Sequence, residues 1–178
     1  MSDLVHIRQA TQHDANILAE LGARTFYDAF AMDNNPEDMT TYMAQAFHPG
    51  RITAALAKAN VYFFLAEVNM QVVGYAKLHA HDGPASLLAK RPLELVRIYA
   101  DQGWIGKGIG TALMRKCQEQ ALQNDHDVLW LGVWERNDRA VAFYRKWGFV
   151  NAGTHTFMLG QDAQTDLIMA CPLKSSNF

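Results

Sequence analysis

The sequence predicts an α/β fold in which helices cover both faces of one mixed β-sheet, and three observations support this. The chain has 178 residues, 49% hydrophobic and 19% charged, so it fits one domain, residues 1–178, with a large buried core. Apolar periodicity predicts seven strands and five helices in the order βααα-ββ-βαβα-ββ. The strand, helix and strand between residues 92 and 134 are long enough for a right-handed parallel crossover.

The first third of the chain is predicted to be mainly helical. A short strand over residues 4–8 comes first, and Asp14 then opens a helix whose apolar residues recur at intervals of three and four. Pro36 begins a second helix, which residues 48–50 end. A third, short helix is expected over residues 52–59.

Three strands are predicted over residues 61–100. The segments 61–68 and 72–80 flank a hairpin signal, which indicates an antiparallel pair. The strand over residues 92–100 alternates, so we expect Glu94 and Ile98 to share one face while Arg97 lies on the other.

The last third begins with a glycine-rich loop and a helix that runs to about Asn124. A buried strand over residues 127–134 follows, and Asn137 and Gly148 cap and stop the final helix. Two closing strands are expected on either side of the polar stretch 160–165. The exposed edge strands of the sheet could pair with a second copy of the chain, so a homodimer is an open alternative.

Charge and composition exclude several classes of function. The net charge of −2 and pI near 6.4 provide no positive field for nucleic acid. The N-terminus lacks an export signal and no apolar run is long enough to span a membrane, so we expect a cytoplasmic protein that binds no membrane. Cys117 and Cys171 have no partners at ligand spacing, so we expect no metal.

The glycine cluster Gly106, Gly108 and Gly110 is the strongest binding signal in the sequence. It lies between a strand and a helix, where unpaired backbone donors and the positive end of the helix dipole favour an anion. Lys107 is not followed by Ser or Thr, so a Walker A loop is excluded. Thr111 stands where a dinucleotide-binding loop needs its last glycine, which disfavours a Rossmann enzyme.

Two motifs in the same order resemble the GNAT acyltransferase superfamily. Its first signature, Arg/Gln-x-x-Gly-x-Gly/Ala, is here the segment from Ile105 to Gly110, with Ile105 in place of Arg or Gln. Its second, N-x-x-A-x-x-F-Y-x-K-x-G-F, matches Asn137 to Phe149. The opening IRQATQHDANILAEL is similar as well, so the resemblance covers essentially the whole chain. Within the superfamily the sequence looks most like the spermidine/spermine acetyltransferase branch.

The resemblance implies a mostly antiparallel sheet whose parallel crossover forms the site for acetyl-CoA, the co-substrate. Backbone atoms of Ile98 to Ala100 would pair with the pantetheine arm, and the loop amides would hold the pyrophosphate. Because Ile105 offers no polar side chain, these amides would carry more of that contact. The implied donor-binding residues are Ile98, Tyr99, Ala100, Ile105, Gly106, Lys107, Gly108, Ile109, Gly110, Thr111, Asn137 and Lys146.

The resemblance also implies direct attack of an amine on the acetyl group. Tyr144 matches the family's acid and would assist the leaving thiolate; its structural alternative is a core aromatic. Glu94 matches a glutamate found in several members and is the candidate base. Four residues of strand separate it from Ile98, about 13 Å, so it would act through ordered water. A salt bridge is the alternative role of Glu94.

The acceptor is expected near the first two helices. Tyr27, Asp28, Asp33 and Glu37 would bind a polyamine or similar small primary amine, although a charged run is also typical of a solvated face. Two other functions remain open. One is the same chemistry on a protein or drug-like amine, and the other is a non-catalytic module that senses CoA or polyamine.

Overall fold

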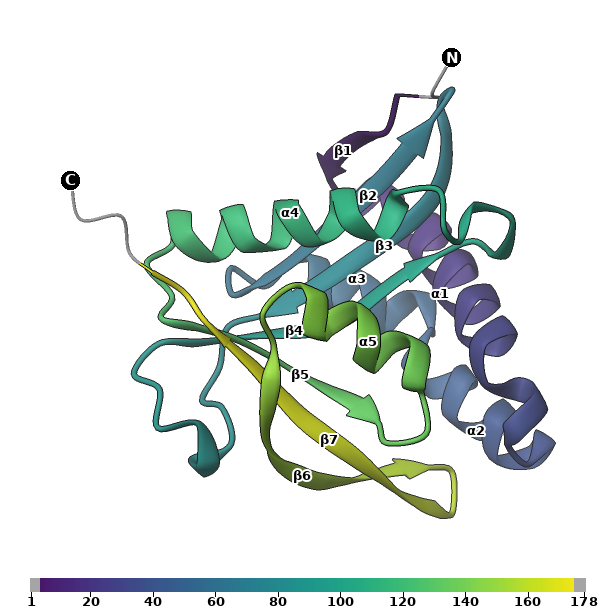
Figure 1. Ribbon diagram of the computed structural model, residues 1–178. Coiled ribbons are helices and arrows are strands. Elements are labelled where there is room, and N and C mark those ends of the chain that lie inside the picture. The colour runs from purple at the N-terminus through teal and green to yellow at the C-terminus, as the bar shows by residue number, and fades with distance from the viewer. Residues whose placement is uncertain (1–3, 175–178) are drawn as a thin grey trace.

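One seven-stranded sheet organises the fold of this computed structural model, which describes residues 4–174 (Figure 1). The strands lie in the order β1-β2-β3-β4-β5-β7-β6. The predicted succession of helices and strands is confirmed. The strands are β1 (His6–Gln9), β2 (Val61–Val68), β3 (Gln71–His79), β4 (Pro92–Ala100), β5 (Val128–Trp134), β6 (Val150–Leu159) and β7 (Asp162–Pro172). The helices are α1 (Ala15–Phe30), α2 (Pro36–Ala46), α3 (Pro49–Leu56), α4 (Ile109–Gln123) and α5 (Asp138–Lys146).

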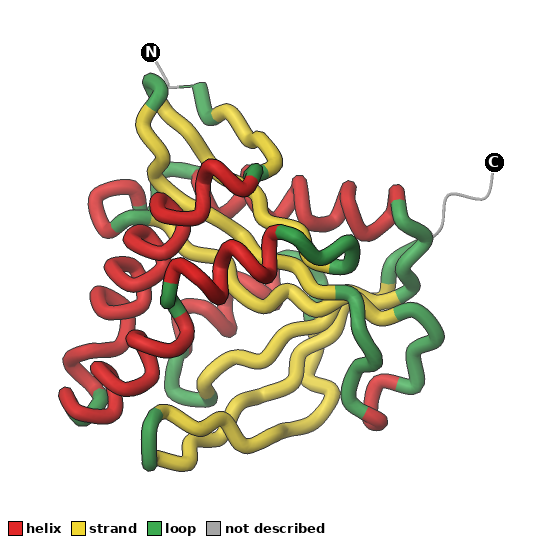
Figure 2. The backbone as a smooth tube through the Cα atoms, turned by 180° about the vertical axis from the view of Figure 1, so that it is seen from behind, coloured by secondary structure: helices red, strands yellow, loops and turns green. Residues whose placement is uncertain are grey.

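Helices cover both faces of the sheet, as predicted. Helices α4 and α5 pack on one side, which we call the α4 face, around a core that includes Leu93, Leu113 and Val141. Helices α1, α2 and α3 pack on the opposite side, the α1 face, which Figure 2 shows from behind. Since each side chain of a strand belongs to one layer, the two faces can bind different ligands.

One helix boundary differs from its prediction. Residues 48–50 were expected to end the second helix, but α2 already ends at Ala46 and Pro49 begins α3. The Nδ1 atom of His48 accepts a hydrogen bond from the backbone N–H of Gly50 at 3.0 Å, so His48 caps α3. A Pro at the first helical position after such a cap starts a helix, which explains the shift from the predicted residues 52–59.

A bulge in β4 overturns one expectation. Lys77 of β3 pairs with Arg97 and the next residue, Leu78, pairs with Leu95, so Val96 is the extra residue. Leu93 and Leu95 therefore share the α4 face with Ile98 and Ala100, whereas Tyr99 packs on the α1 face. The prediction that Glu94 and Ile98 share a face is wrong, because an extra residue reverses the alternation.

None of the helices within residues 4–174 combines the length and the apolar character that crossing a membrane requires.

Candidate active site where β4 and β5 part

The parallel pair β4 and β5 separates after only a few residues. Pairing runs from Pro92 opposite Val128 to Glu94 opposite Trp130. Beyond this point β4 stays paired with β3 as far as Ala100, and β5 stays paired with β7 as far as Trp134. In the described chain, the edge of β4 that faces β5 is therefore free of strand partners over Ile98, Tyr99 and Ala100. Such an edge offers main-chain donors and acceptors to an extended ligand containing amides.

The glycine loop before α4 has the conformation of an anion site. Gly106 and Gly108 have φ angles of 78° and 87°, and a Cβ atom added at either would meet nothing within 4 Å. Asn35 and Asn137 cap α2 and α5 with their side chains, but Gly108 leaves the start of α4 without a side-chain cap. Within residues 4–174, the amides of Gly108 to Thr111 have no acceptor. These free donors fit the phosphates of coenzyme A.

The other predicted donor-binding side chains surround this loop. Lys107 is exposed, with its Nζ atom 5.0 Å from the centre of the Trp104 ring, and Ile105 is also exposed. Lys146, the exposed last residue of α5, forms no ion pair within the described chain. The Oδ1 atom of Asn137 accepts a hydrogen bond from the amide of Ala140 at 3.2 Å, and its NH₂ group can donate to a ligand.

Tyr144 lies on the inner side of α5. Its ring packs 5.6 Å from Phe143 and 5.8 Å from Phe149, measured between centroids, at the border of the α4-face core. Its hydroxyl has no hydrogen-bond partner within the described chain. Burial raises the pKa of Tyr144 above its ordinary value, so the phenol keeps its proton at physiological pH. It is therefore a hydrogen-bond donor available to a ligand.

Glu94 lies at the point of separation, in a cluster with two histidines. Its Oε2 atom is 2.7 Å from Nε2 of His81, and the rings of His79 and His81 are 4.5 Å apart. Burial, with a contribution from His81, lowers the pKa of His79 and favours its neutral form. Ligand atoms of all three residues lie within 4.8 Å of one another. The cluster can share a proton, and two imidazoles with a carboxylate also form a donor set suited to a divalent transition metal.

Comparison with known proteins identifies the family. Residues 22–149 match the acetyltransferase (GNAT) family. The chain belongs to this family. It is 32% identical over 165 residues to an uncharacterized N-acetyltransferase of the pepI 3' region in Lactobacillus delbrueckii subsp. lactis, covering 93% of this chain and 95% of that one. An uncharacterized N-acetyltransferase of Mycobacterium tuberculosis is 33% identical over 156 residues, covering 88% and 96%.

Solved structures of GNAT proteins share the fold. The PaiA N-acetyltransferase of Thermoplasma acidophilum, solved in complex with coenzyme A, aligns with a TM-score of 0.79 and 18% identity over 95% of this chain and 99% of that one. The ribosomal-protein-S18-alanine N-acetyltransferase of Escherichia coli aligns with a TM-score of 0.66 and 18% identity, over 98% and 99%. The predicted fold class, with its parallel pair at the donor site, is therefore confirmed.

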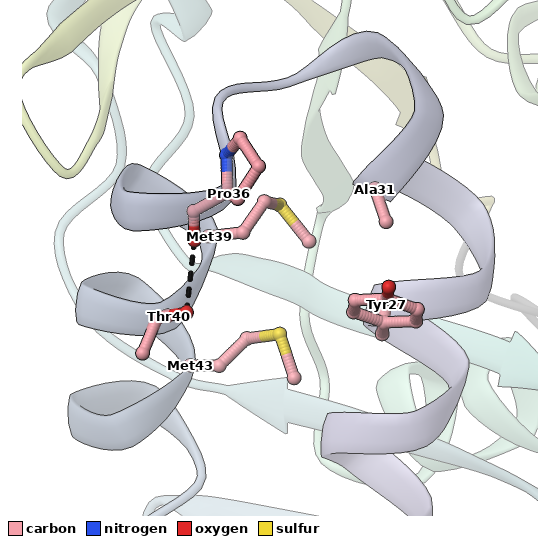
Figure 3. Close-up of a pocket in the computed structure, with 6 residues that line it drawn as sticks. All are labelled: Tyr27, Ala31, Pro36, Met39, Thr40 and Met43. Carbon is pink, nitrogen blue, oxygen red and sulfur yellow. Dashed lines mark hydrogen bonds between the residues drawn. The ribbon is translucent and has the colours of Figure 1, made fainter.

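The acceptor residues expected of this GNAT protein are only partly brought together. Tyr27 lines a pocket of about 410 Å³ between α1 and α2, where it faces the methionines Met39 and Met43 (Figure 3). Asp28, Asp33 and Glu37 are exposed and do not line this pocket. The remaining lining residues are Ala31, Pro36 and Thr40, so the pocket is largely apolar and carries no carboxylate.

Sequence reasoning missed two cations on the α1 face of this GNAT fold, Arg97 and Lys77. Both are partly buried and lie opposite each other on β4 and β3. The signal available in the sequence was Arg97 itself, a charged residue within the largely apolar run LELVRIYA. A further missed contact joins Arg24 of α1 to Asp101 at 2.8 and 2.9 Å, which ties α1 to the start of the donor loop.

Gly108→Ala is expected to weaken coenzyme A binding several-fold. The φ of 87° is unfavourable for alanine by roughly 1–2 kcal/mol, so the loop will shift and displace the amides at the start of α4. Calorimetric titration with coenzyme A measures the effect. Gly148→Ala is the matched control, since Gly148 has the same φ but ends α5. Equal losses in both variants would contradict a specific role of the loop.

Proposed function

We propose that this protein transfers the acetyl group of acetyl-CoA to a primary amine at the point where β4 and β5 part. One observation carries the proposal: a free stretch of strand edge, Ile98 to Ala100, ends near a helix start whose amides lack acceptors. Together they offer an edge that can pair with amides and a site that can hold an anion. Membership of the GNAT family supports the same assignment.

Each part of the donor has residues suited to it. Backbone atoms of Ile98 to Ala100 would pair with the pantetheine amides, and Gly108 to Thr111 would hold the pyrophosphate. Exposed Lys107 and Lys146 would add positive charge. When bound, acetyl-CoA supplies an activated thioester, so that the C–N bond of an amide forms while the C–S bond breaks. The protein then has to neutralise the amine and stabilise the thiolate.

Tyr144 would stabilise the leaving thiolate. Its phenol, protonated because burial raises its pKa, would donate a hydrogen bond to the sulfur. The ordinary pKa of a thiol, near 8.5, lies below that of a phenol, near 10, and burial raises the pKa of Tyr144 further. Full proton transfer from Tyr144 is therefore uphill, and the role that fits is hydrogen bonding to the thiolate.

Glu94 and His81 provide a route for the proton of the amine. A primary ammonium has an ordinary pKa near 10.4, so at pH 7 it must lose a proton before it can attack. Glu94 lies where the strands part and is hydrogen-bonded to the partly exposed His81. A proton taken from the amine, directly or through water, can pass along this pair to solvent. His155 lies against Gly132 of β5 and pairs with Asp166 at 3.5 Å, which offers a second polar group on the α1 face.

The polyamine acceptor stays a prediction. Its support is the group of carboxylates at the junction of α1 and α2, of which Asp28, Asp33 and Glu37 are exposed. Protein and drug-like amines are the alternatives within the same chemistry.

Incubation with acetyl-CoA and a panel of amines should release coenzyme A, detected as free thiol, with at least one primary amine. The panel contains spermidine, spermine, a lysine peptide, a peptide with a free N-terminus and an aminoglycoside. Turnover confined to spermidine and spermine would establish the polyamine prediction. Tight acetyl-CoA binding with no turnover on any primary amine would contradict the proposed function and favour a sensor.

Tyr144→Phe should lower kcat about 100-fold while the Tm stays within a few degrees of the wild type. The substitution removes only the hydroxyl, and general acid or hydrogen-bond assistance contributes at least this much in typical enzymes. Steady-state kinetics and thermal unfolding measure the two effects. Phe143→Leu, a change in the neighbouring ring, controls for packing. An unchanged kcat in Tyr144→Phe would assign Tyr144 to the core alone.

Glu94→Gln should lower kcat mainly at low pH. As the pH rises toward the pKa of the acceptor amine, more of the amine is already neutral and the base becomes dispensable. The pH profile of kcat/KM between pH 6 and 10 tests this, with Glu119→Gln, an exposed glutamate of α4, as the matched control. A uniform decrease at every pH would exclude Glu94 as the base.

A further inference from the structure

A second recess lies on the α1 face, beside the strand that forms the donor edge. It has a volume of about 290 Å³ and lies between α2, α3 and the strands β3 and β4. Its lining residues are Tyr42, Gln45, Ala46, Arg51, Ile52, Ala55, Lys77 and Arg97. Three of these side chains are cationic and none is a carboxylate.

Arg97 is the most enclosed of the three cations. Its guanidinium lies 4.7 Å above the ring of Phe47, and one N–H donates to the hydroxyl of Tyr42 at 3.1 Å. A guanidinium has five N–H donors, and no carboxylate of the described chain forms an ion pair with it. The Arg97 side chain therefore has donors to spare for an anion.

Lys77 and Arg51 add charge to the same recess without acidic partners of their own. Neither forms an ion pair within residues 4–174. Burial, helped by the charge of Arg97, lowers the pKa of Lys77 to about 8, while Glu94 opposes this decrease. Holding partly buried cations together without a counter-ion is unfavourable, and a bound anion would relieve that cost.

The recess is adjacent to the proposed reaction centre. Arg97 precedes Ile98, the first residue of the free donor edge, and its side chain projects to the opposite face because neighbouring residues of a strand alternate. The bulge at Val96 brings Glu94 onto the same face as Arg97. Glu94, the candidate base, is three residues away along β4, but the bulge shortens the interval: Glu94 pairs with His79 and Arg97 with Lys77, two residues apart on β3, or about 7 Å. A small molecule with an amine at one end and an anion at the other can span this interval.

We infer that this recess binds the anionic group, a carboxylate or a phosphate, of an acceptor whose primary amine reaches the point where β4 and β5 part. This deepens the proposed function and rests on it. An amino acid or an aminoalkyl phosphate has the required chemistry. A polyamine would instead bring positive charge against Arg97 and Lys77.

Matched pairs of acceptors, which differ in the anionic group, test the contribution of that group to kcat/KM. The pairs are L-alanine with L-alaninamide and O-phosphoethanolamine with ethanolamine. We expect kcat/KM to be at least ten-fold higher for the anionic member of one pair, and the pair that shows it distinguishes carboxylate from phosphate. Alaninamide has the more easily deprotonated amine, so a preference for alanine cannot arise from amine reactivity. A preference for the neutral member of both pairs overturns the inference.

Arg97→Gln should abolish most of that preference by raising KM for the anionic acceptor, with little effect on its neutral counterpart. Because the variant also removes a cation without a counter-ion, its Tm should not fall. Arg115→Gln, on the exposed side of α4, is the matched control and should keep the preference. An unchanged preference in Arg97→Gln overturns the inference. If Arg97→Gln fails to fold, the same preference is measured in Lys77→Gln, which should also reduce it.

Binding of N-acetyl-L-alanine and of inorganic phosphate, measured by calorimetry with and without coenzyme A, needs no turnover. Wild-type binding that Arg97→Gln weakens at least ten-fold supports the anion site even if no amine is acetylated, which separates this inference from the proposed function. The absence of binding by either probe to the wild type overturns the inference.

Discussion

The short parallel contact between β4 and β5 is the constraint on which the rest of the site depends. Three residue pairs hold the strands together, and each strand then follows its antiparallel neighbour, β3 or β7. The course of each strand beyond the contact is therefore set by the ladder on its other edge, with β3 or with β7. The fold thus keeps a stretch of unpaired backbone accessible inside a sheet, where edges are normally covered. The loop before α4 and the ring of Tyr144 can act on a ligand because they lie beside this unpaired backbone.

Local signals predicted most of the fold. Proline and asparagine at helix starts, glycine at positive φ and strict alternation in strands act within a few residues, so the element order could be predicted from them. The anion loop was also predictable, because Gly106 and Gly108 have positive φ angles, which favour glycine over residues that carry a side chain. The boundary between α2 and α3 was missed because His48 serves as a cap rather than a terminator.

The remaining parts of the site depend on contacts between distant segments, which a pattern in one segment does not contain. The bulge at Val96 is a property of the pairing between β3 and β4, and a simple alternation over LELVRIYA cannot reveal it. The contact of Glu94 with His81, and the meeting of Arg97 with Tyr42 and Phe47, join residues from separate elements. Asp28, Asp33 and Glu37 are clustered in sequence, which predicts a shared acceptor site, yet in space they lie on the exposed surface.

The alternation of side chains along β4 also separates two kinds of recognition within one strand. Donor recognition at Ile98 to Ala100 would use main-chain atoms, which any side chain preserves, whereas the side chain of Arg97 faces the other layer. Substitutions at Arg97, Lys77 or Arg51 can thus redirect the enzyme toward new acceptors while its use of the donor persists. Divergence of substrate preference among descendants of such a protein would therefore need few mutations, concentrated on the α1 face.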